Sequence, residues 1–286
     1  MLRHSIGLLG VGADQHGSFM RGPAEAPALI KEEMRSKSLN AYSELGTNDE
    51  HAYRDWGNIE EGSFASTEEM HAAIKDAVTS IMSAGLTPIT LGGDHHITNP
   101  IVRAVAAHLG RPVSIVQFDA HNDLYENYEG DAHSHASPFA RIFEAGPSVC
   151  CKLVQVGIRT ATDHNRQQAA RYGVTMLEMK DLPLDGKVIA GMLDALLPRD
   201  APVYISFDLD ALDPAHAPGV SHHEPGGMTT RAALDAIHHI RRPIIGADVV
   251  EYNPRRDVHG MTAMVAVKLV REITATIAAS QRDKGL

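Results

Sequence analysis

The segment 118–123, FDAHND, places two carboxylates and an imidazole at the end of an apolar run. Asp119, His121 and Asp123 follow the run VSIVQF at 113–118, which has the composition of a buried strand. A buried carboxylate is costly unless it is paired or coordinated, so the placement suggests a metal site. Taken alone, however, the segment is better explained as a solvated loop at a strand end, where acidic residues are common.

Two other apolar runs end in residues of the same kinds. The run 87–93, TPITLGG, is followed by His95, and the run 203–207, VYISF, is followed by Asp208 and Asp210. In parallel sheets, ligands bind beyond the carboxyl ends of the strands, which lie together at one edge of the sheet. Solvated surface acids would not fall repeatedly at that same topological place, so the pattern favours one shared site.

The acidic residues of these segments would bring four negative charges into one small volume. Two carboxylates that share a site already raise the pKa of one of them strongly, so we expect two divalent cations here. Carboxylates combined with imidazoles favour Mn²⁺, whereas thiolates would indicate zinc. Two ions about 3.5–4 Å apart share a water molecule and convert it to hydroxide near neutral pH. The pattern predicts a hydrolase that uses water and needs no serine or cysteine nucleophile.

The elements that must position these residues alternate between short strands and amphipathic helices. A capping box at 66–69 opens a helix with apolar residues at helical spacing, and Gly85 ends it. Strands that are apolar on both faces and separated by helices predict a parallel sheet covered on both sides. We find no linker, repeat or low-complexity tract, and expect residues 1–286 to form a single-domain three-layer α/β/α sandwich with a mainly parallel sheet. Other strands are expected at 5–12, 152–159 and 242–250. Other helices are expected at 97–110, 163–172 and 187–197. Two more are expected, one that begins at Thr229 or Thr230 and a long one at the C-terminus.

The composition limits the possible partners and compartments. A formal charge of −10 on 286 residues argues against nucleic acid or an anionic membrane surface as the main partner. No stretch approaches the ~18 uninterrupted apolar residues of a spanning helix. The two cysteines, Cys150 and Cys151, are adjacent and offer no framework of spaced pairs, which fits a reducing compartment. We read the N-terminus as a first strand rather than a signal peptide and expect a cytoplasmic protein.

The chain contains four dispersed motifs, which are GGDHHIT (92–98), FDAHND (118–123), SFDLDALDP (206–214) and EYNP (251–254). They resemble those of the ureohydrolase family, which contains arginases, agmatinases and their relatives. The resemblance covers nearly the whole chain, and several stretches look especially like plant-type arginases and their bacterial relatives. A lone DxHxD segment would be unspecific, but four motifs in the right order are highly specific.

The resemblance implies an arginase-like fold, a centre with two Mn²⁺ ions per subunit, and roles for individual residues. His135 matches the family histidine that shuttles protons, and Glu251 matches the carboxylate that pairs with the substrate guanidinium. Asp123 is also implied as an acceptor for a hydrogen bond from the nucleophile. The implied metal ligands are His95, Asp119, His121, Asp123, Asp208 and Asp210.

The implied reaction cleaves a guanidino group to urea and an amine. Whole-chain resemblance favours L-arginine, which would give L-ornithine; agmatine, which would give putrescine, is the alternative, and other guanidino acids stay open. Two rivals come from outside this class. A zinc deacetylase of similar fold should lack the paired GGDH and DAHxD ligands, and an inactive accessory subunit should have lost a ligand or the guanidinium carboxylate. None of these residues is missing.

The positions expected at the far end of the substrate differ from those of most arginases. Tyr125 stands near the place where arginases usually carry an asparagine for the α-carboxylate, and Asp163 is displaced from the usual α-amino partner, with Thr160 and Thr162 nearer to that place. EPGG at 224–227 is more typical of agmatinases. Three acids that could favour a cationic tail are Glu126, Glu129 and Asp131.

Residues near the expected mouth of the site have less specific interpretations. His222 and His223 are interpreted as solvated loop histidines, and Glu224 is left open between a substrate contact and an ordinary acidic loop position. The expected partners are a small guanidino substrate and, by family resemblance, further copies of this chain in a homotrimer or homohexamer.

Overall fold

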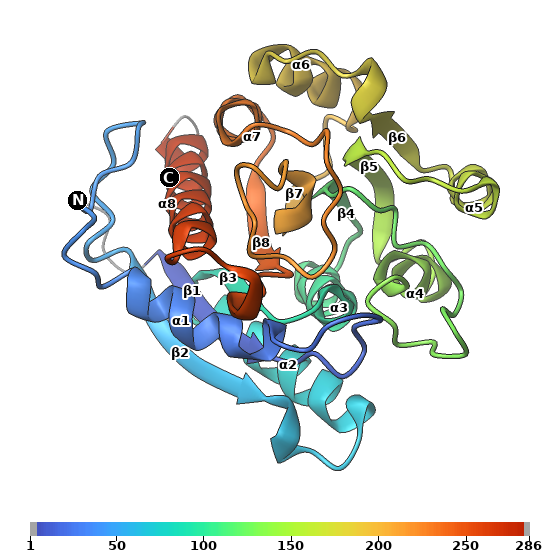
Figure 1. The fold of residues 1–286 in the computed structure, drawn as a ribbon, viewed down its shortest axis with the longest axis horizontal. Coiled ribbons are helices and arrows are strands. Elements are labelled where there is room, and N and C mark those ends of the chain that lie inside the picture. The colour runs from blue at the N-terminus through green and yellow to red at the C-terminus, as the bar shows by residue number, and fades with distance from the viewer. Residues whose placement is uncertain (1–4, 283–286) are drawn as a thin grey trace.

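A computed structural model describes residues 5–282, and within this part of the chain eight strands form one sheet. The strand order is β2-β1-β3-β8-β7-β4-β5-β6, and every neighbouring pair is parallel. Figure 1 shows the sheet through the middle of the molecule. The strands are β1 (Ile6–Gly12), β2 (Tyr53–Glu60), β3 (Thr87–Gly92), β4 (Val113–Phe118), β5 (Cys150–Ile158), β6 (Thr175–Glu178), β7 (Val203–Asp208) and β8 (Ile244–Val250).

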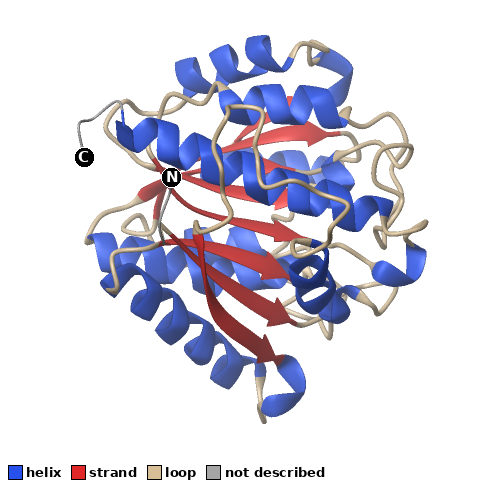
Figure 2. Cartoon of the chain, turned by 90° about the vertical axis from the view of Figure 1, so that its left-hand side faces the viewer, coloured by secondary structure: helices blue, strands red, loops and turns tan. Residues whose placement is uncertain are grey.

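Helices cover both faces of this sheet (Figure 2). One apolar core lies between the sheet and α1, α6, α7 and α8, and a second lies between the sheet and α2, α3, α4 and α5. This arrangement confirms the predicted three-layer sandwich. The helices are α1 (Ala26–Glu33), α2 (Thr67–Ser83), α3 (Thr98–Leu109), α4 (Pro138–Glu144), α5 (Asp163–Tyr172), α6 (Gly186–Leu196), α7 (Thr230–His238) and α8 (Met261–Arg282).

Strand β4 shows why the central strands form. All of its residues are buried, with Val116 and Phe118 in the first core and Val113 and Ile115 in the second. Burial of each such side chain stabilises the fold by roughly 1.5–3 kcal/mol relative to exposure. A strand that is apolar on both faces gains this on both sides, which only a sheet covered by helices on both faces provides.

The helix ends follow local signals in the sequence. Ser66 accepts a hydrogen bond from the backbone N–H of Glu69 at the start of α2, and Thr162 and Asn165 form a capping box at the start of α5. Gly85 follows α2 with a φ of 76°, a left-handed conformation that glycine adopts without steric cost.

The order of strands decides which segments meet at the carboxyl edge. The four central strands are β3, β8, β7 and β4, and their arrowheads point to the same side in Figure 2. The segments that carry candidate site residues follow these four strands. Among the described residues, no helix is long and apolar enough to cross a membrane. The number of domains stays a prediction, and residues 1–4 lie outside the described part.

Candidate active site

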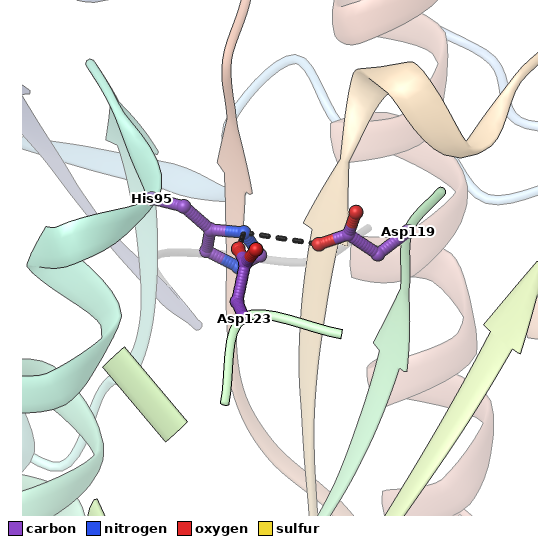
Figure 3. A group of neighbouring side chains, drawn as sticks. All are labelled: His95, Asp119 and Asp123. Carbon is purple, nitrogen blue, oxygen red and sulfur yellow. Dashed lines mark ion pairs between the residues drawn. The ribbon is translucent and has the colours of Figure 1, made fainter. Parts of the chain in front are cut away.

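A first group of ligand-type side chains surrounds His95, the first residue of a short 3₁₀ helix after β3. Its Nδ1 lies 3.2 Å from Asp119 Oδ2, 3.0 Å from Asp123 Oδ2 and 3.3 Å from Asp208 Oδ2. Figure 3 shows the imidazole of His95 facing the carboxylates of Asp119 and Asp123. His95, Asp119 and Asp123 form one of two groups whose spacing could hold a metal ion.

A second group shares one residue with the first. It consists of Asp119, His121 and Asp210, with His121 Nδ1 2.9 Å from Asp210 Oδ2. Asp119 directs Oδ2 toward His95, whereas its Oδ1 lies 3.6 Å from His121 Nδ1. One carboxylate therefore stands between the two groups, as a ligand shared by two ions would. The structure thus brings together all six residues that the sequence analysis names as ligands.

The surroundings of His95 fit a cation at the first group. Its Nε2 lies 2.8 Å from the hydroxyl of Ser206, while Nδ1 is buried and makes no hydrogen bond within the described residues. Burial opposes a charge on His95, but Asp119, Asp123 and Asp208 outweigh it and raise the pKa of His95 well above its ordinary value. Positive charge, from a proton or a metal ion, is therefore favoured between Nδ1 and these carboxylates. Imidazole and carboxylate donors together suit a divalent transition metal.

Two of the carboxylates, Asp123 and Asp208, are destabilised as anions when no metal ion is present. Burial, followed by the charge of Asp119, raises the pKa of Asp123 to about 6. Burial and the charges of Asp210 and Asp119 raise the pKa of Asp208 well above its ordinary value. Both shifts have the physical cause expected from the sequence, namely several acids in one desolvated volume.

The backbone is strained where it presents two of the candidate residues. Asp123 and Glu251 have φ values of 47° and 65°, in the left-handed region that side chains other than glycine rarely adopt. Gly93 allows the turn after β3, because a Cβ there would lie 1.7 Å from the carbonyl oxygen of Ala13. Such strain is typical of functional sites, where the surrounding structure holds the unusual conformation.

Glu251 and His135 form a pair beside the metal-type groups. Oε1 of Glu251 accepts a hydrogen bond from the backbone N–H of His95 at 2.9 Å and lies 3.0 Å from His135 Nδ1. Burial opposes a charge on His135, but Glu251 outweighs it and raises the pKa of His135 to about 9. The backbone N–H of Ser18 points at His135 Nε2 at 3.2 Å and opposes a second proton at that nitrogen.

These residues line a cavity of about 160 Å³. The imidazole of His222 is part of the lining, with its ring centroid 5.4 Å from that of His135 and Nε2 3.4 Å from Ser18 Oγ. The interpretation of His222 as a solvated loop histidine is therefore wrong, because the loop folds inward over the site. His223 is exposed as predicted, and Glu224 Oε1 lies 3.6 Å from His121 Nε2.

The remaining lining of the cavity is uncharged. Tyr125 and Thr160 belong to it, as the sequence analysis expects, and Asn165 joins them from α5. Asp163 is exposed and does not line the cavity. No hydrophobic pattern or motif in the sequence identified Ser18 or Asn165 as site residues, because only the fold brings them close to the strand ends. The other lining residues outside the acids and histidines are Asn122, Tyr128 and Ala136.

The acids expected to favour a cationic tail are not part of this lining. Glu126 pairs with Arg171, and Asp131 Oδ2 lies 2.6 Å from His16 Nδ1. Glu129 is exposed. A larger hollow of about 490 Å³ lies apart from the site, beside α1 and β2, and its buried Lys31 and Arg271 are already paired with carboxylates.

Comparison with known proteins agrees with this geometry. Residues 4–276 match the Arginase family. The chain belongs to the arginase family. It is therefore an enzyme, a hydrolase, as the sequence analysis predicts, and the deacetylase alternative is set aside. This assignment also accounts for the two metal-type groups, since the ligand residues of the family motifs converge here.

Relatives of this arginase-family protein match it over most of their length. Arginase 1, mitochondrial, from Oryza sativa subsp. indica is 44% identical over 284 residues, which cover 96% of this chain and 82% of that protein. A solved structure of arginase from Medicago truncatula superposes with a TM-score of 0.89 at 42% identity, covering 96% of this chain and 88% of the other. Agmatinase, mitochondrial, from Gallus gallus is more distant, at 34% identity over 94% of this chain and 80% of that protein.

The names of these relatives correct the expected compartment. The similar arginases of Oryza sativa, Arabidopsis thaliana and Medicago truncatula are named as mitochondrial proteins, which overturns the expectation of a cytoplasmic protein. The absence of spaced cysteine pairs indicates a reducing rather than an oxidising compartment, but it does not distinguish one reducing compartment from another.

Proposed function

We propose that this chain is a binuclear manganese arginase that converts L-arginine and water to L-ornithine and urea. The observation that carries the proposal is the position of Glu251 in the cavity. One of its oxygens is held by His95 and His135, while no donor among the described residues reaches Oε2. A carboxylate oxygen left without a partner beside two metal-type groups suits a planar cation such as a guanidinium.

The proposed metal ligands divide between the two groups. His95, Asp123 and Asp208 would hold one Mn²⁺, His121 and Asp210 the other, and Asp119 both. Bound divalent ions supply a water that is deprotonated near neutral pH and compensate the charge of the acids.

Glu251 binds the guanidinium and orients its carbon toward that water. A charge-assisted hydrogen bond from the substrate to Oε2 fixes the plane of the cation, and the bonds from His95 and His135 to Oε1 fix the carboxylate. Asp123 accepts a hydrogen bond from the attacking water. These contacts convert a loosely held substrate into an oriented one.

His135 handles the proton that the reaction requires. Hydrolysis breaks the bond between the guanidinium carbon and the amine nitrogen, and the departing nitrogen must gain a proton to leave as an amine. Part of the His135 imidazole lines the cavity, and the rest of the ring is buried. Its two ring nitrogens lie within hydrogen-bond distance of Glu251 and Ser18. It accepts a proton at one nitrogen and delivers it to the departing amine.

The uncharged lining favours arginine over agmatine. The far end of arginine is a zwitterion without net charge, which hydroxyl and amide groups such as those of Thr160 and Asn165 can hold. The amine of agmatine is a cation, and the acids expected to hold it are paired elsewhere or exposed. Similarity to plant arginases, which exceeds that to an agmatinase, supports the same choice.

The decisive experiment measures urea release from four substrates with added Mn²⁺. Arginine should give the highest kcat/KM among arginine, agmatine, guanidinobutyrate and formiminoglutamate. A higher kcat/KM for agmatine would mean that the chain is an agmatinase and not an arginase. If no substrate gave urea with both metals bound, the result would support the inactive-subunit alternative.

The family resemblance also supports assembly into a homotrimer or homohexamer. The apolar stripe of α8 is occupied within this chain, where Leu269, Ile273 and Ile277 are buried in the first core. Contacts between copies must therefore use other surfaces. Light scattering at micromolar concentration should report three or six chains, and a stable monomer would contradict this proposal.

A further inference from the structure

We propose that Asp248 is a positioning residue that acts through Ser206 to accept the outer N–H of His95 and so to direct the Nδ1 of His95 toward the metal site. The inference rests on the metal site proposed above. Neither Asp248 nor Ser206 lines the cavity, and neither belongs to the two metal-type groups. Both residues are fully buried below the site, on the neighbouring strands β8 and β7.

A continuous chain of short hydrogen bonds joins these residues to His95. The hydroxyl of Ser206 donates to Asp248 Oδ1 at 2.7 Å, and His95 Nε2 lies 2.8 Å from the same hydroxyl oxygen. The second oxygen of Asp248 accepts from Tyr204 at 2.8 Å and from Thr98 at 2.9 Å. All members of this chain are excluded from solvent, so water cannot substitute for any of the bonds.

Counting protons determines the direction of each bond. A hydroxyl has one proton, and Ser206 gives it to the carboxylate of Asp248. The Ser206 oxygen must therefore accept the bond from His95, which requires a proton on Nε2. A histidine that binds a metal ion is neutral and carries one N–H, so in the metal-bound protein Nδ1 has the lone pair that binds the ion, and this is the nitrogen that faces Asp119 and Asp123.

Asp248 is able to enforce this direction because it is surrounded by donors. Burial raises the pKa of Asp248, and the charge of His95, followed by the hydroxyl donors Ser206, Tyr204 and Thr98, opposes that rise. A carboxylate whose two oxygens are both occupied by hydroxyl protons can only accept. Imidazole ligands of metals commonly donate their outer N–H to a carboxylate in this way, and here one hydroxyl lies between them.

Replacing Asp248 by asparagine should reverse the chain. The amide offers an N–H to Ser206, so the serine proton can turn toward His95 Nε2 and leave the imidazole proton on Nδ1. An exchange of this kind behind a catalytic histidine preserves geometry while inverting the tautomer. The ion at His95 would then have to displace a proton that the carboxylates hold in place.

The test compares the Mn²⁺ affinity of Asp248→Asn with that of Tyr204→Phe. Tyr204→Phe is the matched control because it also removes a hydrogen bond of Asp248 but leaves the link to His95 in place. We expect Asp248→Asn to bind one of the two ions roughly 10–100-fold more weakly in a chelator competition. Tyr204→Phe should stay within about threefold of the parent protein. Equal affinity in Asp248→Asn, or an equal loss in both variants, would overturn the inference.

A second pair of variants, at Ser206, tests the inference without the buried substitution at Asp248. Ser206→Ala breaks the chain while leaving Asp248 ionised, and Ser206→Thr retains the hydroxyl. Ser206→Ala should show the same weaker binding of one ion, whereas Ser206→Thr should bind both ions with the parent affinity. Saturating Mn²⁺ should restore the kcat of Ser206→Ala with little change in KM. Ser206→Ala with unchanged affinity would refute the inference even if Asp248→Asn fails to fold. A parent protein that binds no Mn²⁺ would instead refute the proposed function.

Discussion

Glu251→Gln separates substrate binding from metal binding more sharply than any other substitution at the site. Glu251 Oε1 must remain an acceptor, because the backbone N–H of His95 points at it from 2.9 Å. The glutamine carbonyl therefore takes the place of Oε1, and the amide nitrogen takes the place of Oε2. A donor then faces the N–H groups of the guanidinium where a charged acceptor stood.

The expected loss follows from this exchange. A hydrogen bond to a charged group contributes ~1.5–3 kcal/mol, and a tenfold change in rate corresponds to about 1.36 kcal/mol. Removal of the bond alone should therefore lower kcat/KM roughly 10- to 150-fold. The opposed donors that remain move the result toward the upper end of this range. Both ions should stay bound, because the contact to the His95 backbone is preserved.

The assay measures urea release from arginine together with the Mn²⁺ content of the same sample. Glu126→Gln is the control, since it removes one charge near the site but from a residue that pairs with Arg171 and does not line the cavity. It should leave kcat/KM within about twofold. Near-normal kcat/KM for Glu251→Gln, with both ions bound, would mean that the guanidinium is held elsewhere.

Three further predictions concern the metals, the proton and the stability of the fold. Asp208→Ala should remove at least one ion after Mn²⁺ loading, and elemental analysis that still finds two ions per chain would contradict the binuclear assignment. His135→Ala should lower kcat more than it raises KM, with partial rescue by imidazole; a pure KM effect would mean that His135 only holds Glu251. Burial, followed by His96, His133, His16 and Lys75, lowers the pKa of His71 from 6.5 to about 2. The folded state therefore binds fewer protons than the unfolded state below pH 6.5. As the pH falls below 6.5, the free energy of unfolding should decrease by roughly 1 kcal/mol per pH unit. His71→Gln should flatten this dependence in denaturant titrations between pH 6.5 and 5, and an unchanged slope would show that His71 does not cause it.

Most of the predicted strands and helices have a strong apolar pattern, although the helix expected at 163–172 is polar. The strand expected at 113–118 coincides with β4, and the helix expected at 163–172 coincides with α5. The sequence analysis did not identify β2, an edge strand whose sequence YRDWGNIE has little apolar alternation and is largely exposed. It also missed α1, α4 and β6, which are short segments stabilised mainly by tertiary packing.

The predicted metal ligands share a simpler property, which is that they lie at or soon after the ends of strands, whereas His135 follows no strand directly and was predicted from the family resemblance alone. His95, Asp119 and Asp208 could be grouped because parallel strands end at one edge, whatever their order in the sheet. Asn165 and Ser18 belong to a helix start and a loop, and no period or motif connects them to the strand ends. Ser206 and Asp248 lie inside strands, where a polar residue is not distinguished by sequence from one that simply pairs with a neighbour.

The order of strands explains why Glu251 acts beside His95 although 156 positions separate them. β8 lies between β3 and β7 in the sheet, so the turn after β8 emerges between the histidine and the aspartates. The N–H of Glu251 donates to the carbonyl of Gly93 at 2.9 Å, and the Glu251 carboxylate accepts from the N–H of His95. These reciprocal bonds clamp the two strand ends together and offset the cost of the left-handed backbone at Glu251, which is of order 1–3 kcal/mol. The carboxylate proposed to bind the guanidinium and the histidine proposed to bind the metal are therefore held as one unit, and neither can be repositioned by changing its own strand alone.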